Sequence, residues 1–319
     1  MIKMIREEDK KRLEKAGYRF CGKNGAVEIC TWTKKAILDE DFCYKQKFYG
    51  IRTHRCLQMT PALPFCTHNC VFCWRDTSIN KVKYDDEPDD PEELLDCLIK
   101  KQRELLSGFP GNKKANQKKV KEAFEPKHIA ISLAGEPTLY PKLDEFIEVA
   151  EKRGMTTFLV SNGTQPDVIK NLKHLPTQLY ITLPAPDEET YLITSRPLIP
   201  DGWQRILKTL EVVKELKGKT RRVIRLTLVK GFNLKNADGY AKLIKIANPD
   251  FVELKGYVWV GFSRERLHQY NMPTHKEIKS FAEELAKELN WKIVDEKENS
   301  RVVLLMKEDK PWRIMKFND

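Results

Sequence analysis

Residues 65–74 have the sequence FCTHNCVFCW, in which three and then two residues separate Cys66, Cys70 and Cys73. This spacing predicts three thiolates around one iron–sulfur cube. A zinc module would pair its CxxC with a second CxxC or with an HxxxH, and neither follows here. With three thiolates, one iron keeps an open position, whereas an electron-transfer cluster normally carries four cysteines. We therefore expect a cluster at which a small molecule binds and reacts.

From about residue 57 onward, short β-branched runs alternate with amphipathic helical stretches, which is the pattern of β/α units around a parallel sheet. Strands are predicted over residues 58–63, 128–133, 156–160, 178–183, 222–229 and 251–258. Helices are predicted over residues 91–107, 143–153, 167–175, 202–216, 237–246 and 275–289. Six such units favour an α/β fold, a partial, open (β/α)6 barrel.

Three domains are predicted, with boundaries near residues 56 and 289. Residues 1–56 show little periodicity beyond a first charged helix, and we interpret them as an N-terminal extension folded around metal. Residues 57–289 form the barrel core. In residues 290–319, two strands at 291–294 and 301–306 predict a small antiparallel β appendage at one sheet edge. Residues 112–121 hold five lysines in ten positions, which is typical of a solvated loop.

Composition narrows the class of protein. The net charge of +11 predicts a surface that attracts polyanions. The charged N-terminus does not resemble a signal segment, and no apolar run approaches membrane-spanning length. Thiols in a reducing cytosol are available for metal rather than for disulfides. We therefore expect a cytoplasmic enzyme with no membrane partner.

Polar residues follow two of the predicted strands. Loops at the carboxyl ends of parallel strands carry the sites of β/α barrels. The run at 128–133 is followed by Gly135, Glu136 and Pro137, where glycine permits a ligand to approach the backbone and the carboxylate complements an ammonium group. Ser161 and Asn162 follow the next strand and either hydrogen-bond a ligand or only form a turn.

A second set of thiols lies nearer the N-terminus. Cys30, Cys43 and Cys56 are thirteen residues apart. They could converge on a second cluster, hold one zinc together with Cys21, or be unligated core residues. Cys97 lies among leucines at helical spacing, which predicts a small core residue.

The cysteine loop resembles the signature of radical S-adenosylmethionine (SAM) enzymes, including an aromatic residue, Phe72, where the family places a side chain against the adenine of SAM. The segment Gly135-Glu136-Pro137 resembles the element that holds the SAM amino group, with Ala134 in place of its usual first glycine. The resemblance implies that Ser161 and Asn162 contact the SAM carboxylate or ribose.

Nearly the whole chain resembles the archaeal tRNA 4-demethylwyosine synthases, which build a tricyclic base next to the anticodon of phenylalanine tRNA. The matching stretches are residues 43–51, 66–74, 132–141, 158–164, 225–231, 253–261 and 271–275. This resemblance implies a second 4Fe-4S cluster on Cys30, Cys43 and Cys56, and it implies that Lys45 forms a Schiff base with pyruvate. A partly buried lysine near another cation, for which Lys47 is the candidate, is a better nucleophile toward a ketone.

The implied reaction condenses pyruvate with N1-methylguanosine-37 of tRNA(Phe), using SAM and two 4Fe-4S clusters. No flavodoxin-like domain precedes the cluster region, so the electron donor is expected to be external. Three alternatives stay open. A radical SAM methylthiotransferase would append an RNA-binding domain, and a glycyl-radical activase would not explain the basic surface or Lys45. A non-enzymatic iron–sulfur sensor or RNA-binding module would make the Gly135–Pro137 segment a coincidence.

Overall fold

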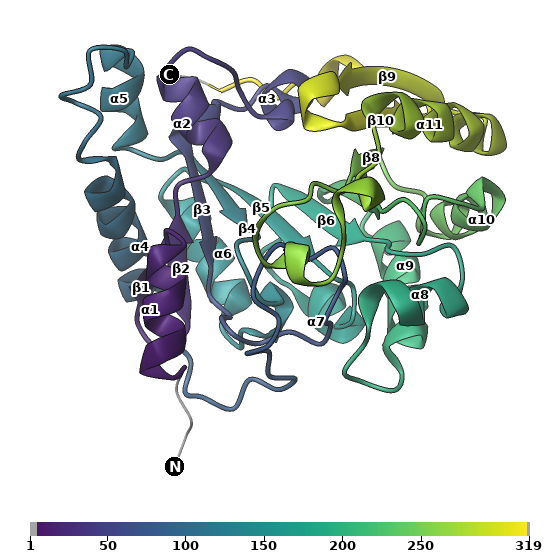
Figure 1. Ribbon diagram of the computed structural model, residues 1–319, viewed down its shortest axis with the longest axis horizontal. Coiled ribbons are helices and arrows are strands. Elements are labelled where there is room, and N and C mark those ends of the chain that lie inside the picture. Colours follow the sequence, from purple (N-terminus) through teal and green to yellow (C-terminus); the bar gives the residue numbers. More distant parts are fainter. Residues whose placement is uncertain (1–4, 318–319) are drawn as a thin grey trace. The chain divides into compact units, whose positions relative to one another are not determined.

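The structure is a computed structural model that describes residues 5–317 (Figure 1). It divides into two compact units. Unit 1 comprises the chain up to Cys66 together with residues 83–160 and 173–177, and unit 2 comprises residues 67–82, 161–172 and 178 onward. The three predicted domains are continuous segments with boundaries near residues 56 and 289, whereas each unit combines several segments of the chain. The predicted boundaries stay a prediction. None of the helices in the described part of the chain is long and apolar enough to cross a membrane.

The sheet of unit 1 contains three of the predicted parallel strands. These are β3 (Cys56–Thr60), β4 (His128–Ile131) and β5 (Thr156–Ser161), and each pairs in parallel with the next. A hairpin of β1 (Arg19–Cys21) and β2 (Gly25–Glu28) extends this sheet, because β2 pairs antiparallel with β3. The hairpin was not predicted, since strands of three and four residues are too short to show a period of two.

Six α-helices belong to the described part of unit 1. They are α1 (Glu7–Lys15), α2 (Thr31–Ile37), α3 (Tyr44–Tyr49), α4 (Pro91–Leu106), α5 (Gln117–Ala123) and α6 (Leu143–Lys152). Helix α4 starts with Pro91 behind an Asp90 cap, whose side chain accepts hydrogen bonds from the amides of Glu92 and Glu93. It packs against the β1–β2 hairpin and α6 (Figure 1).

Helix α5 corrects one prediction. The lysine-rich residues 112–121 were expected to be a solvated loop, but the stretch runs into a helix whose buried side is apolar. Val120 and Ala123 pack in a cluster with Ile29, Ile37 and Leu106. The lysines outnumber the apolar residues so strongly that composition concealed the short amphipathic pattern.

Unit 2 holds the other three parallel strands and the C-terminal appendage. Strands β6 (Gln178–Thr182), β7 (Arg221–Leu228) and β8 (Phe251–Gly256) pair in parallel. Strand β10 (Val302–Met306) pairs antiparallel with both β8 and β9 (Lys292–Lys297), which confirms the predicted antiparallel pair at a sheet edge. The helices are α7 (Pro166–Asn171), α8 (Glu188–Ser195), α9 (Gly202–Glu215), α10 (Ala237–Ala247) and α11 (His275–Leu289).

Candidate active site

The cysteine loop follows β3 and carries three thiols that form no disulfide. Cys66 ends unit 1, whereas Cys70 and Cys73 lie in unit 2. All three are half-buried and unbridged. Burial raises the pKa of the Cys73 thiol above its usual value, and Arg266 and Arg75 oppose that shift. Three thiols at this spacing are a suitable donor set for an iron–sulfur cluster.

The C-terminal end of α8 supports the loop within unit 2. The amide of Val71 donates to the carbonyl of Thr194 at 2.9 Å, and the amide of Asn69 donates to carbonyls at the same helix end. The buried His68 ring nitrogen Nε2 lies 2.7 Å from the hydroxyl of Tyr191. Burial lowers the pKa of His68 to about 3, so the ring is a neutral support for the loop.

A turn after β8 closes over the same loop. Arg266 donates to the carbonyls of Val71, at 3.4 Å, and of Cys73. Phe72 packs on an apolar cluster that includes Val71, Val229, Tyr257 and Leu267. Its assignment to the adenine of SAM stays a prediction.

The Gly135–Pro137 segment contacts the residue immediately before Cys66. The Glu136 amide donates to the Phe65 carbonyl at 2.6 Å. Gly135 has φ +70°, and a Cβ there would come within 2.3 Å of the Ala62 carbonyl oxygen, so only glycine fits. The Glu136 side chain is buried, and its Oε1 accepts hydrogen bonds from the amide and hydroxyl of Thr138. The backbone thus fixes this carboxylate next to the start of the cysteine loop.

Ser161 and Asn162 form a turn in unit 2. Ser161 Oγ accepts from the Gly163 amide at 3.0 Å. Asn162 Oδ1 accepts from the amide and hydroxyl of Thr164, and its Nδ2 donates to Thr67 Oγ1 at 2.9 Å. The turn is therefore attached to the residue after Cys66, and a direct contact of Ser161 or Asn162 with SAM stays a prediction.

The three cysteines that are thirteen residues apart all lie at or directly before the start of a helix or strand of unit 1. Cys30 and Cys43 precede the first turns of α2 and α3, and Cys56 begins β3. Burial raises the pKa of Cys56 to about 12, with the Lys45 charge acting in the opposite direction and Cys30 and Cys43 adding smaller increases. These electrostatic interactions indicate that Lys45, Cys30 and Cys43 lie near Cys56.

Thr53 connects the segments that carry these cysteines. Its hydroxyl accepts a hydrogen bond from the Cys43 amide at 3.1 Å and donates to Gln46 Oε1 at 2.8 Å. Its carbonyl accepts from Thr33 Oγ1, on α2, at 3.2 Å and from the Cys56 amide. The residue is only 1% exposed. This role could not be predicted from the sequence, because it depends on contacts between segments.

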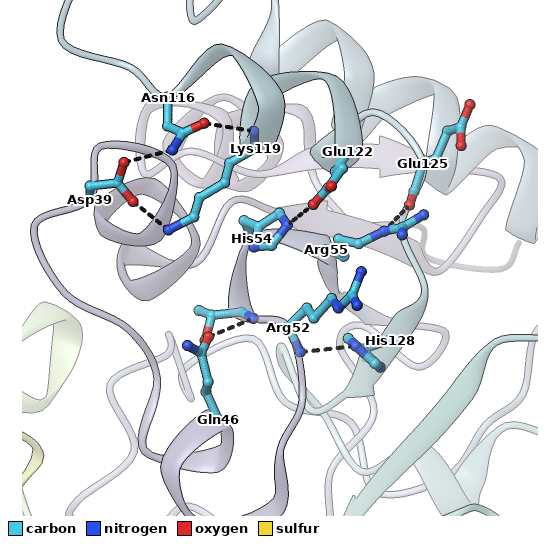
Figure 2. A network of polar contacts seen from close by, with 11 residues as sticks. Asp39, Gln46, Arg52, His54, Arg55, Asn116, Lys119, Glu122, Glu125 and His128 are labelled. Carbon is cyan, nitrogen blue, oxygen red and sulfur yellow. Dashed lines mark hydrogen bonds and ion pairs between the residues drawn. The ribbon is translucent and has the colours of Figure 1, made fainter. Parts of the chain in front are cut away.

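Figure 2 shows the polar network that continues from Gln46 to Arg52 and His128. Gln46 Oε1 also accepts from the Thr53 backbone amide. The neighbouring Arg52 amide donates to His128 Nε2 at 3.1 Å. The other ring nitrogen of His128 then carries the proton and donates to Thr156 Oγ1 at 2.7 Å. Burial, aided by nearby arginines, lowers the pKa of His128 to about 3, so this link stays neutral.

Helix α5 is fastened to the same region (Figure 2). Asp39 forms an ion pair with Lys119 and accepts from Asn116 Nδ2 at 2.8 Å. His54 Nε2 lies 2.6 Å from Glu122 Oε2. The other lysines of the stretch are exposed: Lys113, Lys114, Lys118 and Lys121. Lys119 therefore holds α5 in place, while the remaining four face solvent.

Lys45 lies inside the protein. It is 9% exposed, and its Nζ lies 4.9 Å from the centre of the Phe158 ring. Lys47, predicted to be its neighbouring cation, is exposed. That part of the prediction is wrong, because helical residues two apart do not face each other.

The remaining two cysteines correct a further prediction. Cys21 and Cys97 form a disulfide that joins the end of β1 to α4. Cys97 is therefore not a simple core residue, and Cys21 is not available for a four-thiol zinc site. Helical spacing identified the buried side of α4, but it could not reveal a partner 76 residues away. Among residues 5–317, no three metal-binding side chains are close enough to hold a single ion, whereas a cubane spreads its thiolates over different irons.

Comparison with family models identifies the class of the fold. Residues 60–244 match the model described as the radical SAM superfamily, and residues 246–307 match the model described as wyosine base formation. The first match alone covers more than half of the chain. The six parallel strands are thus those of a partial radical SAM barrel.

Individual relatives are similar over nearly the full length. The SAM-dependent tRNA 4-demethylwyosine synthase of Pyrococcus abyssi is 51% identical over 95% of this chain and 90% of its own. The enzyme of the same name from Methanocaldococcus jannaschii is 42% identical over 96% and 98%. A structure of TYW1 with a lysine–pyruvate adduct bound covers 98% of this chain and 100% of its own, with 40% identity and a TM-score of 0.87. The chain belongs to the family of SAM-dependent tRNA 4-demethylwyosine synthases.

Proposed function

We propose that this chain condenses pyruvate with N1-methylguanosine-37 of phenylalanine tRNA to form 4-demethylwyosine, the tricyclic step of wyosine biosynthesis. The observation that carries the proposal is the 51% identity to a tRNA 4-demethylwyosine synthase over 95% of the chain. The net charge of +11 suits an RNA substrate. The place of action would be the cytoplasm, and the electron donor a separate molecule.

Cys66, Cys70 and Cys73 would hold the first 4Fe-4S cluster. SAM bound there supplies a carbon radical that takes a hydrogen atom from the N-methyl group. Glu136 would bind the SAM amino group, which is supported by its buried carboxylate and by the bond between its amide and the Phe65 carbonyl. Phe72, Ser161 and Asn162 are assigned to the remainder of SAM.

Cys30, Cys43 and Cys56 would hold a second 4Fe-4S cluster. The support is that none of the three forms a disulfide, that Cys30 and Cys43 directly precede helices and Cys56 begins a strand, and that both other thiols raise the pKa of Cys56. Lys45 interacts with the same thiol, so a substrate held by Lys45 would lie beside this cluster.

Lys45 would bind pyruvate covalently. Its amine attacks the C2 carbonyl, and loss of water leaves an imine in which the three carbons of pyruvate are held in place. Burial of the side chain limits hydrolysis of that imine. A lysine–pyruvate adduct in a structural relative at 40% identity supports the assignment. C2 and C3 of pyruvate would then complete the new ring, and its carboxylate would leave as a one-carbon fragment.

Mass spectrometry of the tRNA tests the proposal. Transfer RNA carrying N1-methylguanosine is incubated anaerobically with reconstituted protein, SAM, reductant and pyruvate. The nucleoside should gain the mass of 4-demethylwyosine only when pyruvate is present. The Lys45→Ala variant should lose this product, whereas Lys47→Ala, on the same helix but exposed, should keep it. Product formed without pyruvate, or a methylthio product, would refute the proposed function.

A further inference from the structure

Trp74 is an exposed aromatic residue beside the cysteine loop. It follows Cys73 directly, and 40% of its surface is open to solvent. The guanidinium of Arg75 lies 3.7 Å from the centre of its ring, and Arg75 itself is buried. The indole is therefore held by a cation on one side, although a large part of it remains uncovered.

The turn after β8 fixes the backbone of Trp74. The Phe262 amide donates to the Trp74 carbonyl at 3.1 Å. Gly261 has φ +57°, and a Cβ at this position would come within 2.3 Å of the same carbonyl oxygen, so a side chain there would push Trp74 away. Such close contact is unnecessary for a tryptophan that merely happens to be exposed.

The same turn repeats the pairing of an arginine with an aromatic ring. The exposed Arg264 places its guanidinium 4.8 Å from the ring centre of Trp259. Trp259 is fixed in turn, because its Nε1 donates to the Leu267 carbonyl at 2.8 Å. Unit 2 thus places flat rings and positive charges together beside Cys70 and Cys73.

The turn lies in the part of the chain that is specific to this family. The model for wyosine base formation matches residues 246–307, which include the turn, whereas the general radical SAM match ends at residue 244. Trp74 and Arg75 thus lie within the radical SAM match, whereas the turn that contacts the Trp74 carbonyl lies within the match to wyosine base formation.

We propose that Trp74 and residues 259–264 form a stacking surface for an unpaired base of the RNA substrate, an inference that rests on the proposed function. A base in an anticodon loop must leave its stack to reach an active site, and aromatic rings stabilise the bases exposed by that rearrangement. Arg264 adds a charge that attracts phosphate. A single exposed indole is large enough to stack on one base. A protein partner such as the electron donor would instead bury roughly 800 Å² of surface on each protein.

An anticodon stem–loop RNA with N1-methylguanosine and a fluorescent label provides the binding test. Trp74→Ala should weaken binding about tenfold, the effect of losing one stacked base, while Trp74→Phe should keep most of the affinity. The slope of log affinity against log salt should stay the same in Trp74→Ala, but Arg264→Gln should reduce it by about one phosphate contact. Trp312→Ala is the matched control, because Trp312 is 45% exposed and has Arg221 over its ring at 5.5 Å, yet packs on Phe251 at the start of β8, at the other end of the strand from the turn. The Trp312→Ala variant should bind the RNA with the affinity of the wild-type chain.

A second measurement needs no variant. Ultraviolet cross-linking of the unmodified protein to the stem–loop should attach RNA to the peptide that contains Trp74. Equal affinity in Trp74→Ala, with cross-links elsewhere, would overturn the proposal. So would a defect confined to reduction by a flavodoxin-type donor, because the surface would then serve the donor. A chain that binds the RNA but lacks pyruvate-dependent product would refute the proposed function and leave the stacking result to be judged on binding alone.

Discussion

Replacing Thr53 by valine should destabilise the chain and impair loading of the second cluster. Valine has nearly the same shape, so the change removes polar contacts rather than volume. The Cys43 amide would lose its acceptor and Gln46 Oε1 would lose one of its donors, at a site that is 1% exposed. A buried polar group left without a partner costs about 1–3 kcal/mol. Since Gln46 keeps the Thr53 amide as a donor, we expect a loss of about 2–4 kcal/mol, a large share of the roughly 5–15 kcal/mol by which proteins are stable.

Urea unfolding of the iron-free protein measures this loss. Thr53→Ser is the matched control, because it keeps the hydroxyl and removes one methyl group, at a cost of about 1 kcal/mol. Iron loading is measured in a background in which Cys66, Cys70 and Cys73 are alanine. There, Thr53→Val should hold much less iron and lose the electron paramagnetic resonance signal of the reduced cluster, and Thr53→Ser should restore both.

Two results would refute this reasoning. If valine and serine at position 53 gave the same unfolding free energy, the hydroxyl would not connect the segments around it. If the valine variant were destabilised but bound iron with an unchanged resonance signal, Thr53 would stabilise the fold without positioning Cys43 and Cys56.

Four other predictions follow from the site. Borohydride with pyruvate should add a stable mass to the unmodified protein and to Lys47→Ala but not to Lys45→Ala; an equal yield in Lys45→Ala would mean that another amine reacts. Reconstituted protein should contain about eight irons, and about four without Cys30, Cys43 and Cys56; unchanged iron and spectra would make these thiols structural. Replacing the four exposed lysines of residues 112–121 by glutamine should flatten the salt dependence of tRNA binding, whereas Lys119→Gln should mainly lower thermal stability; an unchanged slope would place the tRNA elsewhere. With a trideuteromethyl group on N1-methylguanosine, deuterium should appear in 5′-deoxyadenosine in proportion to product; full retention in the RNA would exclude this abstraction site.

The barrel strands could be predicted because each combines a β-branched run with a following helix. Helix α8 could not, because its pattern is inverted. Thr194 and Ser195 are buried, whereas Leu192 and Ile193 are 52% and 48% exposed. Such a helix has no apolar stripe facing a core. Its local signals are confined to its start: the Asp187 side chain accepts from the Thr190 amide as a helix cap, and Glu188 and Glu189 lie in the first turn.

The residues of the candidate site also differ in how well the sequence predicts them. Motifs confined to a few adjacent residues, such as the cysteine loop and Gly135–Pro137, were recognisable because their chemistry depends on local spacing. The role of Thr53 and the pairing of Cys21 with Cys97 depend on segments brought together by folding. The error about Lys47 arose from treating sequence neighbours as spatial neighbours, although α3 directs residues two apart to different sides.

The Cys21–Cys97 bridge has a consequence for how the protein matures. Every accessible thiolate competes for iron while a cluster assembles, and a cube built on a wrong combination of sulfurs would be an inactive by-product. This chain has eight cysteines, and the bridge removes two of them from that competition. The other six cysteines form no disulfide, and their spacing divides them into two sets of three, each lacking a fourth thiolate. If both sets bind clusters as proposed, the bridge would keep Cys21 and Cys97 from supplying a fourth thiolate to either cluster.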